Sequence, residues 1–358
     1  MAVLSGLKPE KVFEYFEKLC SVPHGSGNTK IISDMCVGFA RELGLRYRQE
    51  SCNNVIIWKD ASAGYESAAP IILQGHIDMV CAKTDDCTKD MAAEGLDLRT
   101  DGQWVWADKT SLGGDCSDLK GRKLLNLDSE MEGVFTVSCA GGLRADCHLP
   151  GAMEPVDGMS GYTVTLSGLQ GGHSGADIHL GRASANQQMG RVLYSAMERL
   201  HGLRLAAVSG GQFDNVICSR CDAAVAIPAG KEAEFEAFIA EFDAILKNEY
   251  AGCDDGISLT CGKADVTAAI SEITTNLMLH TLLALPQGVQ AMSVDFPGLT
   301  QTSLNMGVLK LEEDGLYITF SIRSSIASQK EMLAQRVHSI VEFAGGTVTE
   351  RGRYPGWQ

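Results

Sequence analysis

Apolar residues recur at helical spacing near the start of the chain and then give way to short apolar runs. Helices are predicted over 9–20 and 28–43, where apolar positions lie three or four residues apart. Short β-branched and leucine-rich runs between turn residues predict strands, and an Asp-Gly pair between two such runs predicts a hairpin. The predicted strands are 55–58, 71–73 and 122–128, and the hairpin is 95–108.

The pattern changes near Gly158, after which alternating strands and amphipathic helices follow one another. We therefore predict two domains, residues 1–158 and 159–358. The first is predicted to be α/β, with a mixed sheet flanked by helices. The second is predicted to be an α+β layer of antiparallel sheet and helices, built from two similar halves. Its expected helices are 183–200, 231–247, 276–285 and 328–343.

Composition and charge describe a globular chain and exclude several classes of partner. The 358 residues are 45% apolar and 21% charged, which is unlike a disordered chain. A formal net charge of −15 argues against a nucleic-acid or anionic-membrane surface, because both need clustered positive charge. The sequence also shows no apolar run of about 18 residues and no basic, apolar leader. We expect no nucleic-acid or membrane partner and a cytoplasmic location.

Twelve cysteines are scattered along the chain, a pattern that indicates reduced, buried thiols rather than disulfides. The one close pair is Cys218 and Cys221. If both lie on one strand they face opposite sides, and no second Cys-x-x-Cys completes a zinc site. Core packing is therefore the prediction for this pair.

Acidic and imidazole side chains follow two of the predicted strands. His76 and Asp78 lie two residues apart just after strand 71–73, a spacing that suits a metal-binding imidazole held by a carboxylate. Asp128 ends strand 122–128, and Asp115 follows a glycine-rich turn. Strand carboxyl ends are where open α/β sheets bind ligands. Each residue alone also fits a plainer interpretation, a hydrogen-bonded histidine or an aspartate that caps a turn.

Longer motifs distinguish between these interpretations. The stretches QGHIDMV, TSLGGD, LLNLDSEMEGVFTVSCAGG and GLQGGHSGADIHLGRASANQQMGRVL closely resemble the aminoacyl-histidine (Xaa-His) dipeptidases, part of the metallopeptidase group that includes carboxypeptidase G2-like enzymes. The resemblance covers nearly the whole chain. It implies a two-metal amidohydrolase with a catalytic α/β domain and a lid that dimerises. The substrates implied are small unblocked peptides.

The resemblance also implies roles for individual residues. His76 corresponds to a ligand of the first metal, and Asp78 corresponds to the acid that orients His76. Asp115 corresponds to the carboxylate that bridges two metals, and Asp128 to the remaining ligand of the first. One histidine and two carboxylates with an open position is also sensible zinc chemistry.

In the lid, the resemblance assigns three further residues. His173 corresponds to a histidine that stabilises the oxyanion, often at the site of a partner subunit. Asn215 and Arg323 correspond to substrate-binding residues, and the planar guanidinium of Arg323 suits a terminal carboxylate.

Two departures from the family pattern bear on activity. No Glu stands between Asp115 and Asp128, so the acidic pair that supplies the general base and a ligand of the second metal has no evident counterpart. The chain also stops where the resemblance predicts a return to the catalytic domain with a late histidine ligand. We expect one zinc site to be retained and hydrolysis to be weak. Glu130 and Glu132 lie near Asp128 and could replace the missing acids, but after a strand end they are expected to face solvent. Alternatives are a non-catalytic homologue that binds one metal or a peptide, and a dimerisation module.

Overall fold

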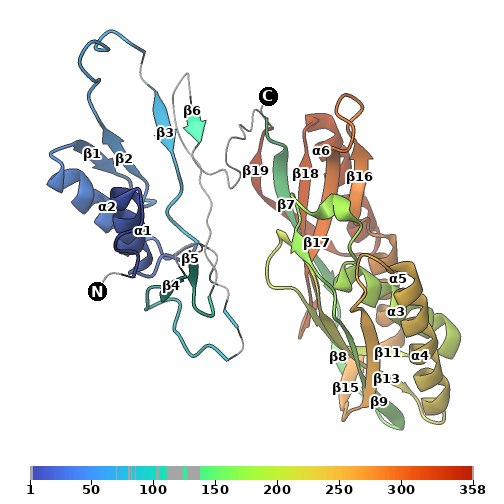
Figure 1. Cartoon of the computed structure of the whole chain (residues 1–358). Helices are drawn as coiled ribbons and strands as arrows, with labels where there is room; N and C mark the ends of the chain where they lie inside the picture. The colour runs from blue at the N-terminus through green and yellow to red at the C-terminus, as the bar shows by residue number, and fades with distance from the viewer. Residues whose placement is uncertain are drawn as a thin grey trace. The chain divides into compact units, whose positions relative to one another are not determined.

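The structure is a computed structural model. It describes residues 3–69, 71–79, 81, 83–84, 86–101, 105–110, 124–126 and 138–356, with backbone only at 124–126. The chain divides into two compact units, Met1–Phe135 and Thr136–Gln358 (Figure 1). Asp115 and Asp128 lie outside the described residues, as do Glu130 and Glu132.

In its described part, the first unit contains two helices and three two-stranded sheets. Strands β1 and β2 pair antiparallel, as do β4 and β5, whereas β3 and β6 pair in parallel. The elements are α1 (Glu10–Cys20), α2 (Lys30–Glu42), β1 (Arg46–Gln49), β2 (Val55–Trp58), β3 (Ile72–Gln74), β4 (Leu98–Thr100), β5 (Val105–Ala107) and β6 (Leu124–Asn126). The helices, strands and hairpin predicted here from the apolar pattern are confirmed to within a few residues.

The core of the first unit is small in its described part. Its buried cluster is Leu4, Cys20, Leu98 and Ala107. By contrast, Leu73 of β3 is 66% exposed. Parallel strands are ordinarily covered on both faces, so this strand is poorly covered by the described residues.

The second unit is a nine-stranded sheet layered with helices. Its strands follow the order β14-β9-β13-β11-β17-β18-β7-β19, and β16 also pairs with β17. The sheet strands are β7 (Gly141–Pro150), β9 (Met159–Ser167), β11 (Arg204–Gly210), β13 (Cys221–Pro228), β14 (Ser258–Lys263), β16 (Gly288–Met292), β17 (Thr300–Glu312), β18 (Gly315–Ser324) and β19 (Thr347–Tyr354). Smaller pairs are β8 (Met153–Pro155) with β15 (Ala268–Ile270), and β10 (Gly172–His173) with β12 (Val216–Ile217).

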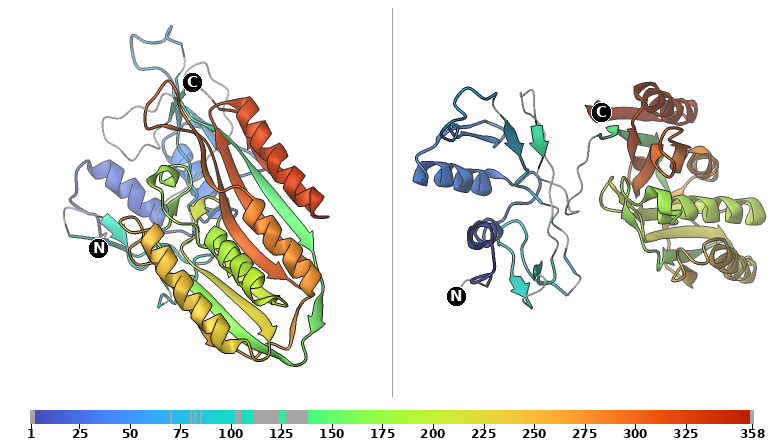
Figure 2. Two further views of the ribbon diagram at one scale, coloured as in Figure 1. Left: turned by 90° about the vertical axis from the view of Figure 1, so that its right-hand side faces the viewer. Right: turned by 45° about the horizontal axis from the view of Figure 1, so that its top comes forward.

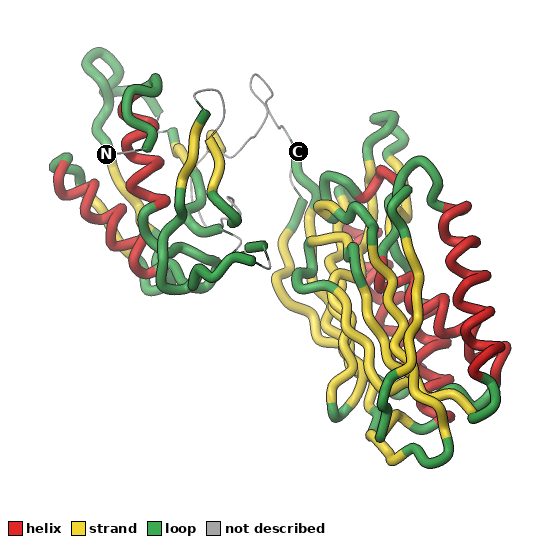
Figure 3. The backbone as a smooth tube through the Cα atoms, turned by 60° about the horizontal axis from the view of Figure 1, so that its bottom comes forward, coloured by secondary structure: helices red, strands yellow, loops and turns green. Residues whose placement is uncertain are grey.

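The helices of this unit cover one face of the sheet (Figures 2 and 3). They are α3 (Ala185–Leu200), α4 (Glu232–Glu249), α5 (Glu272–Ala284) and α6 (Ala327–Phe343). Strand residues alternate accordingly, because successive side chains point to opposite faces. In β18, for example, Ile318, Phe320 and Ile322 are buried toward the helices. Thr319 and Arg323 lie on the other face, which we call the open face.

The sheet is built from two similar halves, as predicted from the sequence. One half is β9-α3-β11-β13-α4-β14, with strand order β14-β9-β13-β11. The other uses β7, α5, β17, β18, α6 and β19, with the matching order β19-β7-β18-β17. The halves join where Gly210 of β11 pairs with Leu309 of β17. Strands β14 and β19 therefore end this strand order, and β16 is a further edge strand beside β17.

The predicted domain boundary at 158 differs from the observed one. Strand β7, which precedes that boundary, lies between β18 and β19 in the second unit. The unit therefore begins near residue 136. Strand pairing between residues 143 and 322 is a long-range contact that local periodicity does not reveal.

Cysteines described by the structure are all free thiols. Cys218 and Cys221 are both buried, so their predicted core role is confirmed. The reason differs, because β12 ends at Ile217 and the two residues do not share a strand. Burial raises the pKa of Cys147 to about 12 and holds that thiol protonated. Cys52, Cys81 and Cys139 are exposed, contrary to the general expectation of burial.

No described helix is long and apolar enough to cross a membrane.

Candidate active site

His76 lies just beyond the carboxyl end of β3, in the loop where the sequence placed it. Its side chain is 9% exposed, and its Nδ1 lies 2.9 Å from the backbone oxygen of Asp78. A carbonyl oxygen only accepts, so Nδ1 donates the proton of this hydrogen bond. In the neutral ring the lone pair then lies on Nε2, which is the form that binds a metal.

Asp78 contributes to this arrangement in a way the sequence did not predict. Its carboxylate Oδ1 lies 3.5 Å from His76 Nδ1, so its backbone oxygen makes the closer contact. The hydroxyl of Ser26 donates to Asp78 Oδ2 at 2.7 Å. The Ser26 backbone N–H donates to Met79 O at 3.0 Å. These bonds tie the loop after β3 to the segment before α2.

Two of the three predicted metal ligands, Asp115 and Asp128, lie outside the described residues. Among the residues that are described, no group of three His, Cys, Asp or Glu side chains is placed to hold a metal ion. The parallel register pairs Gln74 of β3 with Asn126 of β6. The two strands thus end at the same edge, two residues before His76 and Asp128 in the sequence.

His173 lies at the end of β10 in the second unit and is exposed. Its Nδ1 accepts hydrogen bonds from the backbone N–H groups of Gly175 at 3.2 Å and Ala176 at 3.1 Å. A nitrogen that accepts carries no proton, so in the neutral ring the proton is on Nε2. This geometry makes Nε2 a hydrogen-bond donor. It is the opposite tautomer from that of His76.

Asn215 is held between two anchored neighbours. The side-chain amide of Asn305, which is 1% exposed on β17, donates to Asp214 O at 2.9 Å and to Val216 O at 2.7 Å. The backbone oxygen of Asn215 accepts from the Ser174 N–H at 2.8 Å. The loop with Asn215 therefore lies directly beside the loop with His173.

Arg323 reaches the same place from the open face of β18. A Cβ atom built on Gly175 would lie 3.1 Å from His173 Cε1 and 3.4 Å from Arg323 Cζ. Glycine at 175 therefore lets the imidazole and the guanidinium approach one small space. Of the three lid residues predicted from the sequence, the structure brings the side chains of His173 and Arg323 together and places the backbone of Asn215 against the adjoining Ser174.

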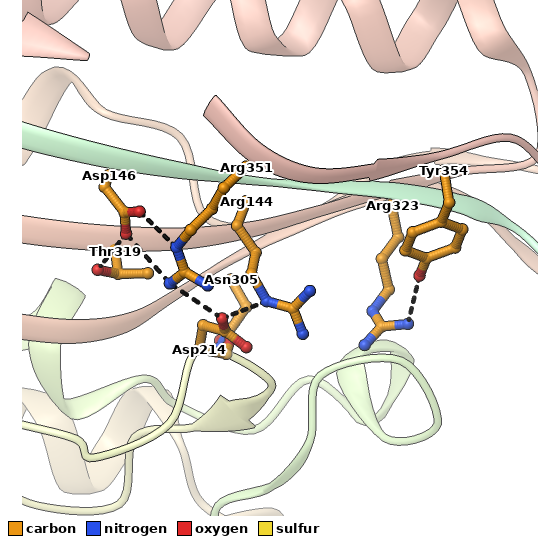
Figure 4. Close-up of polar contacts among 8 residues, drawn as sticks. All are labelled: Arg144, Asp146, Asp214, Asn305, Thr319, Arg323, Arg351 and Tyr354. Carbon is orange, nitrogen blue, oxygen red and sulfur yellow. Dashed lines mark hydrogen bonds and ion pairs between the residues drawn. The ribbon is translucent and has the colours of Figure 1, made fainter. Parts of the chain in front are cut away.

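An ion-pair cluster on the open face supports the Asn215 loop (Figure 4). The Asp214 carboxylate pairs with Arg144 Nε, and Arg351 Nη2 lies 3.5 Å from it. Arg351 Nε also lies 2.5 Å from Asp146 Oδ2. Burial alone would raise the pKa of Asp146, but Arg351 and a hydrogen bond from Thr319 outweigh it and lower that pKa.

Sequence reasoning missed these supporting residues: Ser26, Arg144, Asp146, Asp214, Asn305 and Arg351. Their hydrogen-bond partners lie between 52 and 205 positions away in the sequence, so tertiary structure rather than a local motif brings them together. Of these residues, only Asp214 could have been suspected from the sequence, because it directly precedes the predicted site residue Asn215.

Asn305→Asp is expected to lower the free energy of unfolding by about 3–5 kcal/mol, because it places a buried carboxylate against two carbonyl oxygens. Burial would raise the pKa of this new carboxyl above its unfolded value. The loss relative to wild type should therefore shrink as pH falls through that pKa. Hydrogen exchange of residues 213–216, the loop that the Asn305 amide holds, should also accelerate.

The matched control is Asn186→Asp, since Asn186 is equally buried and its amide donates to Gly210 O and Met306 O. It should destabilise the unit without selectively exposing 213–216 to exchange. Equal exchange of that loop in the two variants would contradict the assigned role of Asn305.

Comparison with known proteins identifies the class. Residues 164–253, which include β13, α3 and α4, match the peptidase dimerisation domain family. The chain is 32% identical to the cytosol non-specific dipeptidase of Escherichia coli (strain K12), over 100% of this chain and 82% of that protein. It also matches the crystal structure of aminoacylhistidine dipeptidase from Vibrio alginolyticus with a TM-score of 0.68 and 31% identity, over 99% of this chain and 81% of that one.

These similarities define a peptidase fold that includes a dimerisation domain. The chain belongs to the aminoacylhistidine dipeptidase family of peptidases, as its motifs predicted. The alignment with the Escherichia coli dipeptidase spans 402 residues, whereas this chain has 358. That dipeptidase therefore has residues in the aligned region with no counterpart here.

Proposed function

We propose that this chain is a zinc-dependent dipeptidase-type protein that binds small unblocked peptides, including those with histidine in the second position. The approach of His173 and Arg323 at Gly175 carries the proposal, together with the bond of the Asn215 backbone to the adjoining Ser174, because the three residues come from separate elements. The lid spans the second unit, and the catalytic part lies in the first.

Within the lid, each side chain has a chemically suited role. Arg323 presents a planar guanidinium for the terminal carboxylate of the peptide. His173 Nε2–H donates to the oxygen that becomes negative when the scissile carbonyl is attacked. Asn215, on the adjoining loop, would add a side-chain amide for the peptide. A donor fixed by two backbone N–H groups needs little reorganisation as that charge develops.

In the first unit, the residues that would hold zinc are His76, Asp115 and Asp128. The protonation of His76 at Nδ1 fits this role, because Nε2 then has the lone pair. Bound zinc would polarise the scissile carbonyl and lower the pKa of a bound water. Asp78 and Ser26 hold the imidazole in place.

We also propose a cytoplasmic location and self-association through the lid. A matching dimerisation domain family and the name of the cytosol dipeptidase support these assignments. Strands β11 and β17 pair with each other within the chain. A second copy would therefore contact the exposed edges at β14, β16 or β19, or the helical layer.

Hydrolysis of dipeptides by this chain is expected to be at least about 100-fold slower than by the two relatives, because no Glu between Asp115 and Asp128 supplies a general base. The measurement is turnover of a dipeptide panel with Zn²⁺, Mn²⁺ or Co²⁺, with EDTA as the control. Robust turnover restored by metal would show that another residue, such as Glu130, acts as the base. Without turnover, bound metal would favour a non-catalytic homologue over a dimerisation module.

A further inference from the structure

Tyr354 lies against the guanidinium of Arg323 at the end of β19 (Figure 4). Its ring crosses Gly142, which pairs with Tyr354 on one side and with Arg323 on the other. A Cβ atom on Gly142 would lie 2.5–2.7 Å from the Tyr354 phenol atoms. Because residue 142 is a glycine and has no side chain, the Tyr354 ring can lie across β7 toward β18.

The position of Tyr354 is fixed from the backbone as well. Lys330, which is 4% exposed on α6, donates from Nζ to the Tyr354 backbone oxygen at 2.6 Å. A buried ammonium that satisfies a specific carbonyl is costly to displace. This bond anchors the end of β19 to α6.

The hydroxyl of Tyr354 keeps its own proton available. Arg323 Nη1 donates to Tyr354 Oη at 3.5 Å, the long end of hydrogen-bond distance, so the oxygen acts as acceptor. A phenol has one proton to donate, and no described residue accepts it. Arg323 Nε is likewise buried without a partner in the described chain.

Two other arginines on the open face, unlike Arg323, have carboxylate partners among the described residues. Arg144 pairs with Asp214, and Arg351 pairs with Asp146. Among the described residues no carboxylate lies within ion-pair distance of Arg323. A guanidinium and a phenol thus stand side by side with donors to spare, and an anionic acceptor would satisfy both.

We propose that Tyr354 is a substrate-binding residue whose phenolic O–H donates to the terminal carboxylate that Arg323 binds. This inference rests on the proposed role of Arg323. Tyr354 and Arg323 would together distinguish a peptide that ends in a free carboxylate from one that ends in an amide. An amide brings no negative charge to the guanidinium and offers one oxygen instead of two.

The test is calorimetric binding of alanyl-histidine and of alanyl-histidinamide to the zinc-loaded full chain. Tyr354→Phe removes only the hydroxyl and should weaken binding of the free dipeptide about 10-fold. Binding of the amide should be unchanged. Tyr317→Phe is the matched control, because Tyr317 is also 38% exposed on the open face but donates to Asp314.

Arg323→Met distinguishes the two ways of failing. If Arg323→Met loses the preference for the free carboxylate and Tyr354→Phe binds like wild type, the role of Tyr354 is wrong and that of Arg323 stands. If Arg323→Met keeps the preference, or wild type binds neither peptide, the proposed role of Arg323 fails and the inference with it. An equal loss in Tyr317→Phe would also contradict a specific role for Tyr354.

Discussion

His76→Ala is expected to abolish zinc binding, because the lone pair on Nε2 is the imidazole contribution to the proposed site. Two carboxylates without the imidazole are a weak, oxygen-only set for zinc. Asp78→Ala should weaken zinc binding by about 10–100-fold, as expected for a residue that orients a ligand. The measurement is the zinc dissociation constant of each full-length variant by competition with a chelator.

His24→Ala is the control for this experiment. His24 Nδ1 also lies against a backbone oxygen, that of Val22 at 2.7 Å. The His24 carbonyl accepts a hydrogen bond from the Met79 N–H at 2.9 Å, so His24 also contacts the loop after β3. Its replacement should leave zinc affinity within about twofold of wild type. Wild-type zinc affinity in His76→Ala would show that the metal binds elsewhere.

A segment beginning at residue 160 is expected not to fold, whereas one beginning at 138 should unfold cooperatively. The difference is β7, which pairs with β18 over its full length and with β19 on the other side. Leu143 and Leu149 of β7 are 1% and 2% exposed, and burial of each contributes about 1.5–3 kcal/mol. Without β7, β18 and β19 would lose their shared partner.

Urea unfolding of residues 138–358 and 160–358, followed by circular dichroism, measures this difference. The longer segment should show one sigmoidal transition, and the shorter one should show no cooperative transition. The same midpoint and slope in both segments would show that β7 is dispensable. That result would support a domain boundary at residue 158, as predicted from the sequence.

Strand β7 also shows why the sequence revealed most elements but not all. Leu143, Ala145, Cys147 and Leu149 alternate with Arg144, Asp146 and His148, which is a period of two. Alanine and cysteine make this alternation weak. The segment also follows directly on the motif that resembles the catalytic domain, so local reasoning assigned it there. Helices α3, α4 and α6 have long apolar patterns and were predicted almost at their observed bounds.

In the candidate site, too, some residues could be predicted from the sequence and others could not. His173, Asn215 and Arg323 were predicted by resemblance, and the structure brings the His173 and Arg323 side chains together with the Asn215 backbone on the adjoining loop. Their supports were not predictable, because Asn305 reaches Asp214 only after β17 pairs in the sheet. Ser26 likewise reaches Asp78 only through the tie between its loop and Met79. A polar side chain has no local sequence signal for a partner set by tertiary structure.

Zinc content of the full-length chain tests the central claim most directly. After zinc loading and exhaustive dialysis, elemental analysis should find about one zinc ion per chain, held by His76, Asp115 and Asp128. About two ions per chain would mean that further ligands complete a second site. No bound zinc would contradict the account, because the residues that follow β3 and β6 would then form no metal site.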